Sequence, residues 1–348
     1  MKIEKKKAPI RIGLYFVYII CLVTLVTLLN HISSLGVTSY NDNAAELGGT
    51  KISRRPFVSV IIPVYNSEKF IRRCIKSLLY QTLTQIEFIF VDDCGTDKSV
   101  EIIREYMASD PRIKLLRNSR NMGAGESRNA GMSVASGLYL GTVDPDDWIS
   151  KDFYDALFKA ASQGNYDIAK SLLYIKKRGK YKLYKLNNKM KRGLAAGAKI
   201  FEVFHFQQTT AIYRKAIFDA HPLARYGNTS TSEDATFLTK FSFYAKNITF
   251  TDNGRYYYER FSDSLSNSKP TAAIAQAELD AANQRLDFLV SNAAPGSYKV
   301  FLNLTQKKLT EKYKTFLTIE NEIPSKEFMK VKSRFTNTFN KITNLSKL

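Results

Sequence analysis

Hydrophobic positions from residue 57 onward alternate between two patterns. Short unbroken apolar runs are typical of buried strands, and apolar residues at every third or fourth position are typical of helices that cover a sheet. The predicted strands are 57–64, 86–91, 112–118 and 138–143. The predicted helices are the segment after Asn66-Ser67, which can cap it, then 96–107, 123–136 and 150–161. The alternation predicts an α/β fold whose mixed, mostly parallel sheet is flanked by helices.

The ends of the chain add a different kind of segment. Residues 12–29 are eighteen residues without a charge, and five basic residues precede them. That length is about what a helix needs to cross ~30 Å of hydrocarbon, and it exceeds the apolar region of a signal peptide. We therefore expect a single-pass membrane anchor with a cytoplasmic N-terminus. The side of the membrane on which the rest of the chain lies stays open. After Thr271, helices are predicted over 274–290 and 300–317.

Composition excludes several classes. The chain has 348 residues, a formal net charge of +20, 44% hydrophobic residues and 24% charged residues, which describes a folded protein rather than a disordered one. Three cysteines and three histidines lack the spacing of a zinc site or a disulfide framework. A dinucleotide-dependent oxidoreductase would need G-x-G-x-x-G after a strand, and the first strand here ends in PVYN.

Carboxylates gather at the ends of the predicted strands despite the positive net charge. Asp92 and Asp93 follow the strand 86–91, and a second cluster follows the strand 138–143. The second cluster contains Asp144, Asp146 and Asp147. In open sheets, ligands bind outside the carboxyl ends of the strands. The pattern therefore predicts chemistry at this edge, and the later pair Glu233-Asp234 is a candidate to join it.

Four segments in this order carry a resemblance to a known family. They are VSVIIPVYNSEKFIRRCIKSLLYQT, FIFVDDCGTDKS, NMGAGESRNAGMSVASG and GTVDPDDWI. Together they resemble the nucleotide-sugar half of glycosyltransferase family 2, which has the GT-A fold. The resemblance is dense over 57–161 and looser over 204–266. It implies a metal-dependent, inverting transfer of a sugar from a nucleoside diphosphate sugar, most often a UDP-sugar. The acceptor would be a carbohydrate or lipid-linked molecule, in glycan or polysaccharide synthesis.

The same resemblance implies a division of the chain. Residues 1–30 would form the tail and anchor, and residues 31–56 the linker. Residues 57–268 would form the GT-A domain, with a nucleotide-sugar half (57–165) and an acceptor half (166–268). Residues 269–348 would form a helical region.

Candidate donor-binding residues lie at the strand ends. Pro63 and Tyr65 finish the first strand, where an exposed ring can floor a pocket for a flat base; ordinary turn chemistry is the alternative. Asp92 or Asp93 can accept hydrogen bonds from a nucleobase or ribose, and the resemblance gives this position the role of reading the base. Cys94 and Gly95 stand where the family more often has Gly-Ser.

Arg128 and the second acidic cluster are candidates to bind the charged part of the donor. The guanidinium of Arg128 can bind a base or a phosphate, although a plain surface arginine is the alternative. A departing diphosphate develops negative charge, which a divalent ion stabilises. Mn²⁺ or Mg²⁺ takes oxygen ligands from one or two carboxylates plus phosphate. Asp144, Asp146 and Asp147 are the candidate ligands, and spacing alone leaves open which two bind. A solvated turn is the other interpretation.

The resemblance assigns the general base to Asp234, which would take the proton of the acceptor hydroxyl. The same segment is also a good helix start, with Ser232 as the cap and acidic residues in the first turn. Downstream, Arg260, Ser264 and Ser266 are candidates for contact with phosphate.

Residues 174–192 carry nine Lys or Arg and no acid, with Arg178-Gly179 between two strand-like arms. A hairpin there could attract an anionic acceptor, a lipid-linked phosphate or an acidic membrane surface, or could be a solvated face. A non-enzymatic, membrane-anchored polyanion binder would also explain the charge. It leaves the acidic clusters unexplained, and we expect no nucleic-acid partner.

Overall fold

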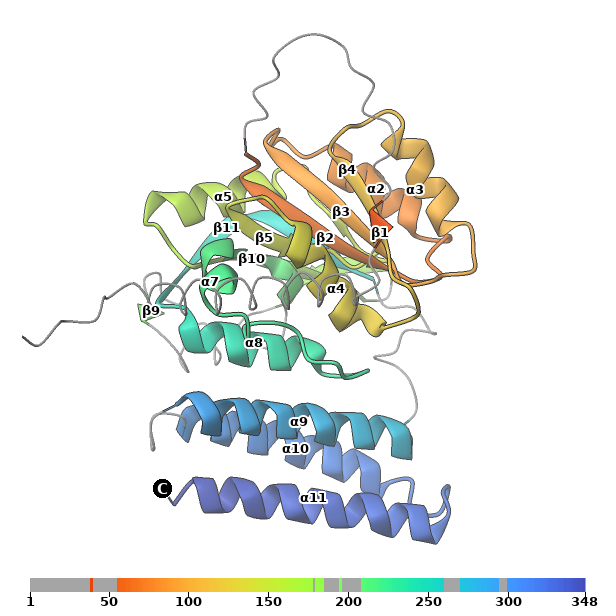
Figure 1. Cartoon of the computed structure of the whole chain (residues 1–348), viewed down its shortest axis with the longest axis vertical. Coiled ribbons are helices and arrows are strands. Elements are labelled where there is room, and N and C mark those ends of the chain that lie inside the picture. The colour runs from red at the N-terminus through yellow and green to blue at the C-terminus, as the bar shows by residue number, and fades with distance from the viewer. Residues whose placement is uncertain are drawn as a thin grey trace, which may run out of the picture.

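The computed structural model describes residues 55–177, 179–184, 208–259, 270–293 and 299–347, together with the backbone of two short strands, β1 (Thr38–Ser39) and β9 (Leu194–Ala195). A central sheet carries helices on both faces, and three further helices form a layer beyond α8 (Figure 1). This confirms the α/β prediction.

The sheet is mixed, with a parallel core. Its order is β1-β4-β3-β2-β5-β10-β7-β11-β6, and β8 and β9 pair with β7 and β11 off this path. The strands are β2 (Val58–Val64), β3 (Ile86–Asp92), β4 (Ile113–Arg117), β5 (Tyr139–Thr142), β6 (Trp148–Ile149), β7 (Ile168–Lys177), β8 (Lys180–Leu183), β10 (Ala211–Arg214) and β11 (Asn247–Tyr258). Strands β4, β3, β2 and β5 run parallel, and β10 is inserted antiparallel between β5 and β7.

Alternate side chains of the central strands feed two separate cores, because successive residues of a strand point to opposite faces. Val60 and Phe90 belong to the core covered by α2 (Ile71–Leu79), α3 (Ser99–Met107) and α5 (Phe153–Gln163). Ile61 and Val91 belong to the core covered by α4 (Gly123–Val134), α7 (Lys215–Ala220) and α8 (Glu233–Tyr244). The unbroken apolar runs follow from burial on both faces.

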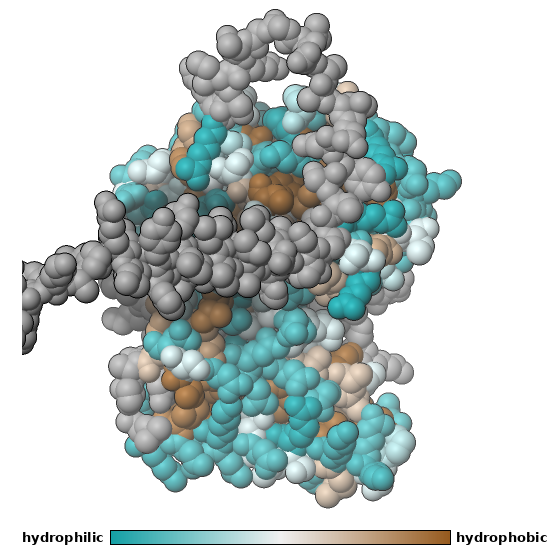
Figure 2. Space-filling model, viewed as in Figure 1, coloured by the Kyte–Doolittle hydropathy of each residue, from teal (hydrophilic) through white to brown (hydrophobic). Residues whose placement is uncertain are grey.

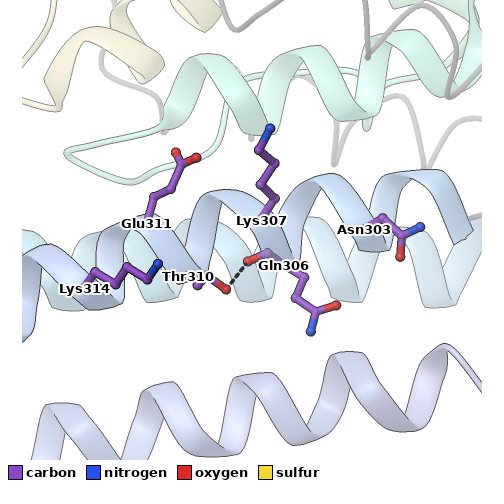
Figure 3. A pocket seen from close by; sticks show the side chains of 6 residues that line it. All are labelled: Asn303, Gln306, Lys307, Thr310, Glu311 and Lys314. Atoms are coloured by element: carbon purple, nitrogen blue, oxygen red, sulfur yellow. Dashed lines mark hydrogen bonds between the residues drawn. The ribbon is translucent and has the colours of Figure 1, made fainter.

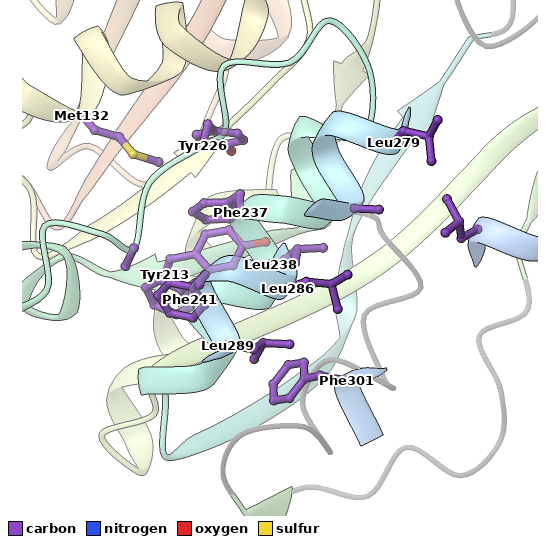
Figure 4. Close-up of a cluster of buried hydrophobic side chains, with 14 of the residues drawn as sticks. Met132, Tyr213, Tyr226, Phe237, Leu238, Phe241, Leu279, Leu286, Leu289 and Phe301 are labelled. Atoms are coloured by element: carbon purple, nitrogen blue, oxygen red, sulfur yellow. The ribbon is translucent and has the colours of Figure 1, made fainter. Parts of the chain in front are cut away.

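The second core extends through α8 into the C-terminal helices. Phe237 and Phe241 meet the ring of Tyr213 edge-on at centroid distances of 5.0 and 5.1 Å, and Leu286 and Leu289 of α9 belong to the same core (Figure 4). The three helices are α9 (Ala272–Asn292), α10 (Lys299–Leu317) and α11 (Ser325–Leu345). The helices predicted over 274–290 and 300–317 are confirmed, and α11 was not predicted. The side of this layer in view is mainly hydrophilic (Figure 2).

Two predictions about the chain's local structure and setting are wrong. Neither Asn66 nor Ser67 caps α2, which begins at Ile71 without a side-chain cap. The Asn66 side-chain oxygen instead accepts from the Thr96 amide at 2.8 Å, and the Ser67 amide donates to the Ser99 hydroxyl at 2.9 Å. Both residues tie the end of β2 to the loop after β3, because both strands end at the same edge of the sheet.

The expected single-pass anchor is not supported. None of the helices within the described residues is long and apolar enough to cross a bilayer, and residues 12–29 lie outside the described residues. We therefore do not carry the membrane localisation further.

Candidate functional site

Arg128 brings two of the predicted acidic clusters together. Its two terminal nitrogens donate to Asp144 at 2.7 Å and to Glu233 at 3.1 Å. The side chain is 5% exposed, and its guanidinium lies 5.2 Å from the centre of the Tyr226 ring. Burial opposes the charge of Arg128, but the neighbouring charges raise its pKa above the ordinary value. A single guanidinium thus joins the loop after β5 to the start of α8.

Two glycines let α4 bring Arg128 to this position. A Cβ at Gly125 would lie 2.7 Å from the carbonyl oxygen of Gly227, in the segment that leads to Glu233. A Cβ at Gly131 would lie 2.5 Å from a methyl carbon of Ile61 on β2. Glycine at both positions therefore allows α4 to approach the sheet and the loop before α8 closely.

Asp92 and Asp93 are buried at the end of β3 and are bonded to backbone. Asp93 accepts from the Asn118 side chain at 2.7 Å and from the amides of Met122 and Gly123 at 2.8 and 2.7 Å, at the start of α4. Asp92 accepts from the Gly95 amide at 3.0 Å, and burial raises the pKa of its carboxyl. These bonds shape the loops at the strand ends. The predicted roles in reading a base stay predictions.

The other donor candidates lie at the same edge. Tyr65 is 51% exposed just beyond β2, and Pro63 is buried within that strand. Cys94 has φ +61°, and its thiol donates to the Asn118 carbonyl at 2.9 Å. A left-handed backbone at a position favoured by glycine explains why the family more often has glycine here. Arg260 lies outside the described residues, as do Ser264 and Ser266.

The three aspartates after β5 have different surroundings. Asp147 is 1% exposed, and its two oxygens accept from the Tyr256 hydroxyl at 2.7 Å and the Glu259 amide at 3.0 Å. Asp144 faces Arg128. Burial and the charge of Asp144 raise the pKa of Asp146 to about 6. Within the described residues, no three or more acidic, histidine or cysteine side chains group as metal ligands. Asp144 and Asp146 still fit an ion that takes its remaining ligands from phosphate, because a cation would relieve the repulsion between them.

Glu233 and Asp234 are the first two residues of α8. Burial raises the pKa of Glu233, against the opposing charge of Arg128. The prediction that Ser232 caps this helix is wrong, because Ser232 has a left-handed backbone with φ +55° and makes no cap bond. Its hydroxyl instead donates to Glu278 of α9 at 2.7 Å. The start of α8 is therefore held from α4 on one side and from α9 on the other.

Sequence reasoning missed Glu259, which is 4% exposed at the end of β11. Its carboxylate forms ion pairs with Arg73 of α2 and Lys176 of β7 and accepts from the Tyr181 hydroxyl at 3.3 Å. Burial favours a higher pKa, but the hydrogen bonds from Lys176 and Arg73 lower it overall. Arg73 also donates to the Asp146 carbonyl at 2.6 Å. The only sequence signal for Glu259 was its position next to Arg260. The residues that Glu259 contacts are distant in the chain.

The predicted hairpin is confirmed where the structure describes it. Lys177 of β7 pairs with Lys180 of β8, and Gly179 has φ +77° at the turn. The Tyr181 hydroxyl accepts from the Trp148 indole at 3.0 Å, beside the Asp144–Asp147 loop. Residues 185–192 lie outside the described residues.

A groove elsewhere on the surface is a poor alternative site. It runs along one side of α10 and is lined by Asn303, Gln306, Lys307, Thr310, Glu311 and Lys314 (Figure 3). It contains none of the predicted acidic clusters. We therefore place the candidate site at the carboxyl edge of the sheet.

Comparisons with known proteins identify a family that part of the chain matches. Residues 59–221 match the model of glycosyl transferase family 2. The chain is 32% identical over 218 residues to the uncharacterized glycosyltransferase EpsJ of Bacillus subtilis, covering 61% of this chain and 63% of that protein. It is 27% identical over 220 residues to the glycosyltransferase GlyG of Streptococcus pneumoniae, covering 60% and 72%. This chain therefore spans 63% of EpsJ, which is less than two thirds of its length.

Solved structures share the fold. TarS 1–349 of S. aureus, crystallised in complex with UDP-GlcNAc, superposes with a TM-score of 0.57 at 18% identity, covering 83% of this chain and 90% of that one. The mannosyltransferase PcManGT of Pyrobaculum calidifontis, in complex with GDP-Man and Mn²⁺, gives a TM-score of 0.50 at 13% identity, covering 84% and 85%. At these identities the likeness establishes a GT-A-like fold.

Proposed function

We propose that this chain, whose residues 59–221 match glycosyl transferase family 2, transfers a sugar from a nucleoside diphosphate sugar to a carbohydrate or lipid-linked acceptor. The reaction would serve the synthesis of a glycan or polysaccharide. The observation that carries the proposal is the contact of Arg128 with both Asp144 and Glu233. It brings a donor-side acidic loop next to the pair that contains the candidate base.

The donor is proposed to be a UDP-sugar. TarS was crystallised with UDP-GlcNAc and with UDP, which supports a uridine nucleotide by analogy of fold. In this chain, the exposed ring of Tyr65 and the carboxylates of Asp92 and Asp93 lie at the strand ends where a nucleotide would bind.

Asp144 and Asp146 are proposed to hold Mn²⁺ or Mg²⁺. When bound, such an ion would neutralise the charge that develops on the departing diphosphate. Asp147 is the poorest ligand of the three, because both of its oxygens already accept internal hydrogen bonds. Arg73 supports this loop by donating to the Asp146 carbonyl. The choice of Asp144 and Asp146 rests on these contacts.

Asp234 is proposed to act as the general base. It would accept the proton of the acceptor hydroxyl as that oxygen bonds to the anomeric carbon and the bond from that carbon to the diphosphate breaks. A single displacement of this kind inverts the anomeric configuration. Glu233 is paired with Arg128, so the neighbouring carboxylate of Asp234 is the better candidate for this proton transfer.

A donor screen tests the function. Purified full-length protein is incubated with a panel of nucleotide sugars, with and without Mn²⁺, and release of nucleoside diphosphate is measured. We expect Mn²⁺-dependent release from at least one UDP-sugar and its loss in Asp234→Asn. Binding of anionic glycans without any turnover across the panel would contradict the proposal and favour a binding protein.

A further inference from the structure

Helix α9 contacts the segment around the candidate base at three points. Gln284 donates to the Asn228 side chain at 2.8 Å, in the loop before α8. Glu278 accepts from the Ser232 hydroxyl at 2.7 Å. Two turns farther along α9 from Glu278, Arg285 donates to the Thr236 hydroxyl at 3.4 Å. These contacts lie on both sides of Asp234 in the chain.

The approach of α9 to this segment is close. A Cβ at Gly227 would lie 2.3 Å from the side-chain oxygen of Gln284. The residue before the acidic pair, Ser232, has a left-handed backbone that an L-residue seldom adopts. Such a conformation persists only where surrounding contacts impose it, and the bond to Glu278 supplies one.

Arg285 carries a charge into this interface. Its side chain is 2% exposed, and burial lowers its pKa to about 10. The charges of Glu278 and Asp234 oppose that shift. Lys308 of α10 is affected in the same way: burial lowers its pKa, and the charge of Asp234 opposes this. A buried cation is costly unless an anion is near it, and the carboxylates of Glu278 and Asp234 offset part of that cost for Arg285.

We propose that the C-terminal helices complete the catalytic unit, with Arg285 as the positioning residue of Asp234. This rests on the proposed function. Arg285 does not touch the reacting atoms. It fixes the first turn of α8 through Thr236, and its charge favours the ionised carboxylate that accepts the proton.

Arg334 of α11 provides a matched control. It forms an ion pair with Asp280 of α9 at 2.7 Å. Loss of Arg334 removes a guanidinium and an ion pair from the same helical layer. Arg334 is 38% exposed, so it controls for the loss of a charged side chain rather than for the loss of buried packing.

The experiment compares Arg285→Met, Arg285→Lys and Arg334→Met in the full-length protein, after circular dichroism has established folding. For Arg285→Met we expect kcat to fall about ten- to hundred-fold, because a misplaced catalytic group can cost that much. We expect the KM for the donor to stay within about two-fold, because the proposed donor-binding residues lie at the ends of β2, β3 and β5, whereas Arg285 contacts α8. Arg285→Lys should recover much of the loss, and Arg334→Met should leave both constants near wild type.

Coupling to Asp234 gives the second readout. Adding Arg285→Met to Asp234→Asn should lower the residual activity no further, because the two residues act as one unit. Should Arg285→Met fail to fold, Thr236→Val removes the hydroxyl that accepts from Arg285 and is expected to lower kcat by a smaller factor, about three- to ten-fold, at unchanged KM.

The outcomes separate two failures. If Asp234→Asn is inactive while Arg285→Met and Thr236→Val keep wild-type kcat, the positioning role is wrong and the proposed function stands. Equal losses in Arg285→Met and Arg285→Lys, or in Arg334→Met, would also overturn it. If Asp234→Asn itself keeps wild-type turnover, the base assignment fails and the inference falls with it.

Discussion

The three aspartates after β5 illustrate how neighbouring residues of one type receive different tasks. Asp147 holds the end of β11 through Tyr256 and the Glu259 amide. Asp144 pairs with Arg128, and Asp146 sits where burial and a like charge disfavour its ionised form. The sequence predicted that this cluster lies at the sheet edge. It could not assign the tasks, because they depend on partners from β11 and α4.

The raised pKa of Asp146 predicts a pH dependence of stability. Between about pH 4 and 6 the folded protein holds a proton that the unfolded chain has released, so the contribution of Asp146 to stability falls as pH rises through this window. Asp146→Asn removes this loss. Between about pH 4 and pH 7, the free energy of unfolding of the variant should therefore rise relative to that of wild type by on the order of 1–3 kcal/mol, as measured by urea unfolding.

Asp152 provides a control of opposite sign. Burial favours a higher pKa for its carboxyl, but hydrogen bonds, first that from Ser150, lower it overall. Its contribution to stability is present above the unfolded pKa and is lost as pH falls through the folded pKa. Asp152→Asn should therefore lose stability relative to wild type as pH rises. An identical pH trend in the two variants would contradict the assignment for Asp146.

At the scale of elements, α4 is the piece that connects the site. It starts where Asp93 accepts two backbone amides, and it presents Arg128 to the loop after β5 and to α8. Its glycines were visible in the sequence. The segments that they approach were not predictable, since the Gly227 loop is far along the chain.

Arg128→Met tests this connection. Removing the guanidinium leaves Asp144 and Glu233 as unpaired, partly buried carboxylates. We expect a loss of stability near the lower end of the ~3–5 kcal/mol typical of broken buried pairs, since Asp144 is 31% exposed. Urea unfolding at neutral pH measures it. Arg72→Met breaks an exposed pair with Glu105, which solvent screens, and should cost far less. Equal costs would mean that Arg128 does not bridge the clusters.

Across the whole molecule, the sequence predicted the features that depend on local pattern. It did not predict those that depend on contacts between distant segments. Strands such as β2 and β3 were predictable because burial on both faces leaves unbroken apolar runs. Helix caps were not, because Ser67 and Ser232 bond to residues of distant segments. The same holds for the Glu259 network.

The C-terminal helices show the same difference between features that the sequence predicts and features that depend on distant contacts. Its helices α9 and α10 follow from their apolar periodicity, whereas their place against α8 follows from packing across Phe237 and Leu286. That packing puts Glu278 and Arg285 beside the acidic pair. The family model ends at residue 221, so neither residue could be carried over from it.

The central claim is that carboxylates from separate segments serve one donor site. Calorimetric titration of UDP into the full-length protein, with and without Mn²⁺, tests it most directly when wild type, Asp146→Asn and Asp234→Asn are compared. The account predicts that Mn²⁺ strengthens UDP binding in wild type and Asp234→Asn and has little effect in Asp146→Asn. The same enhancement by Mn²⁺ in Asp146→Asn as in wild type would contradict it.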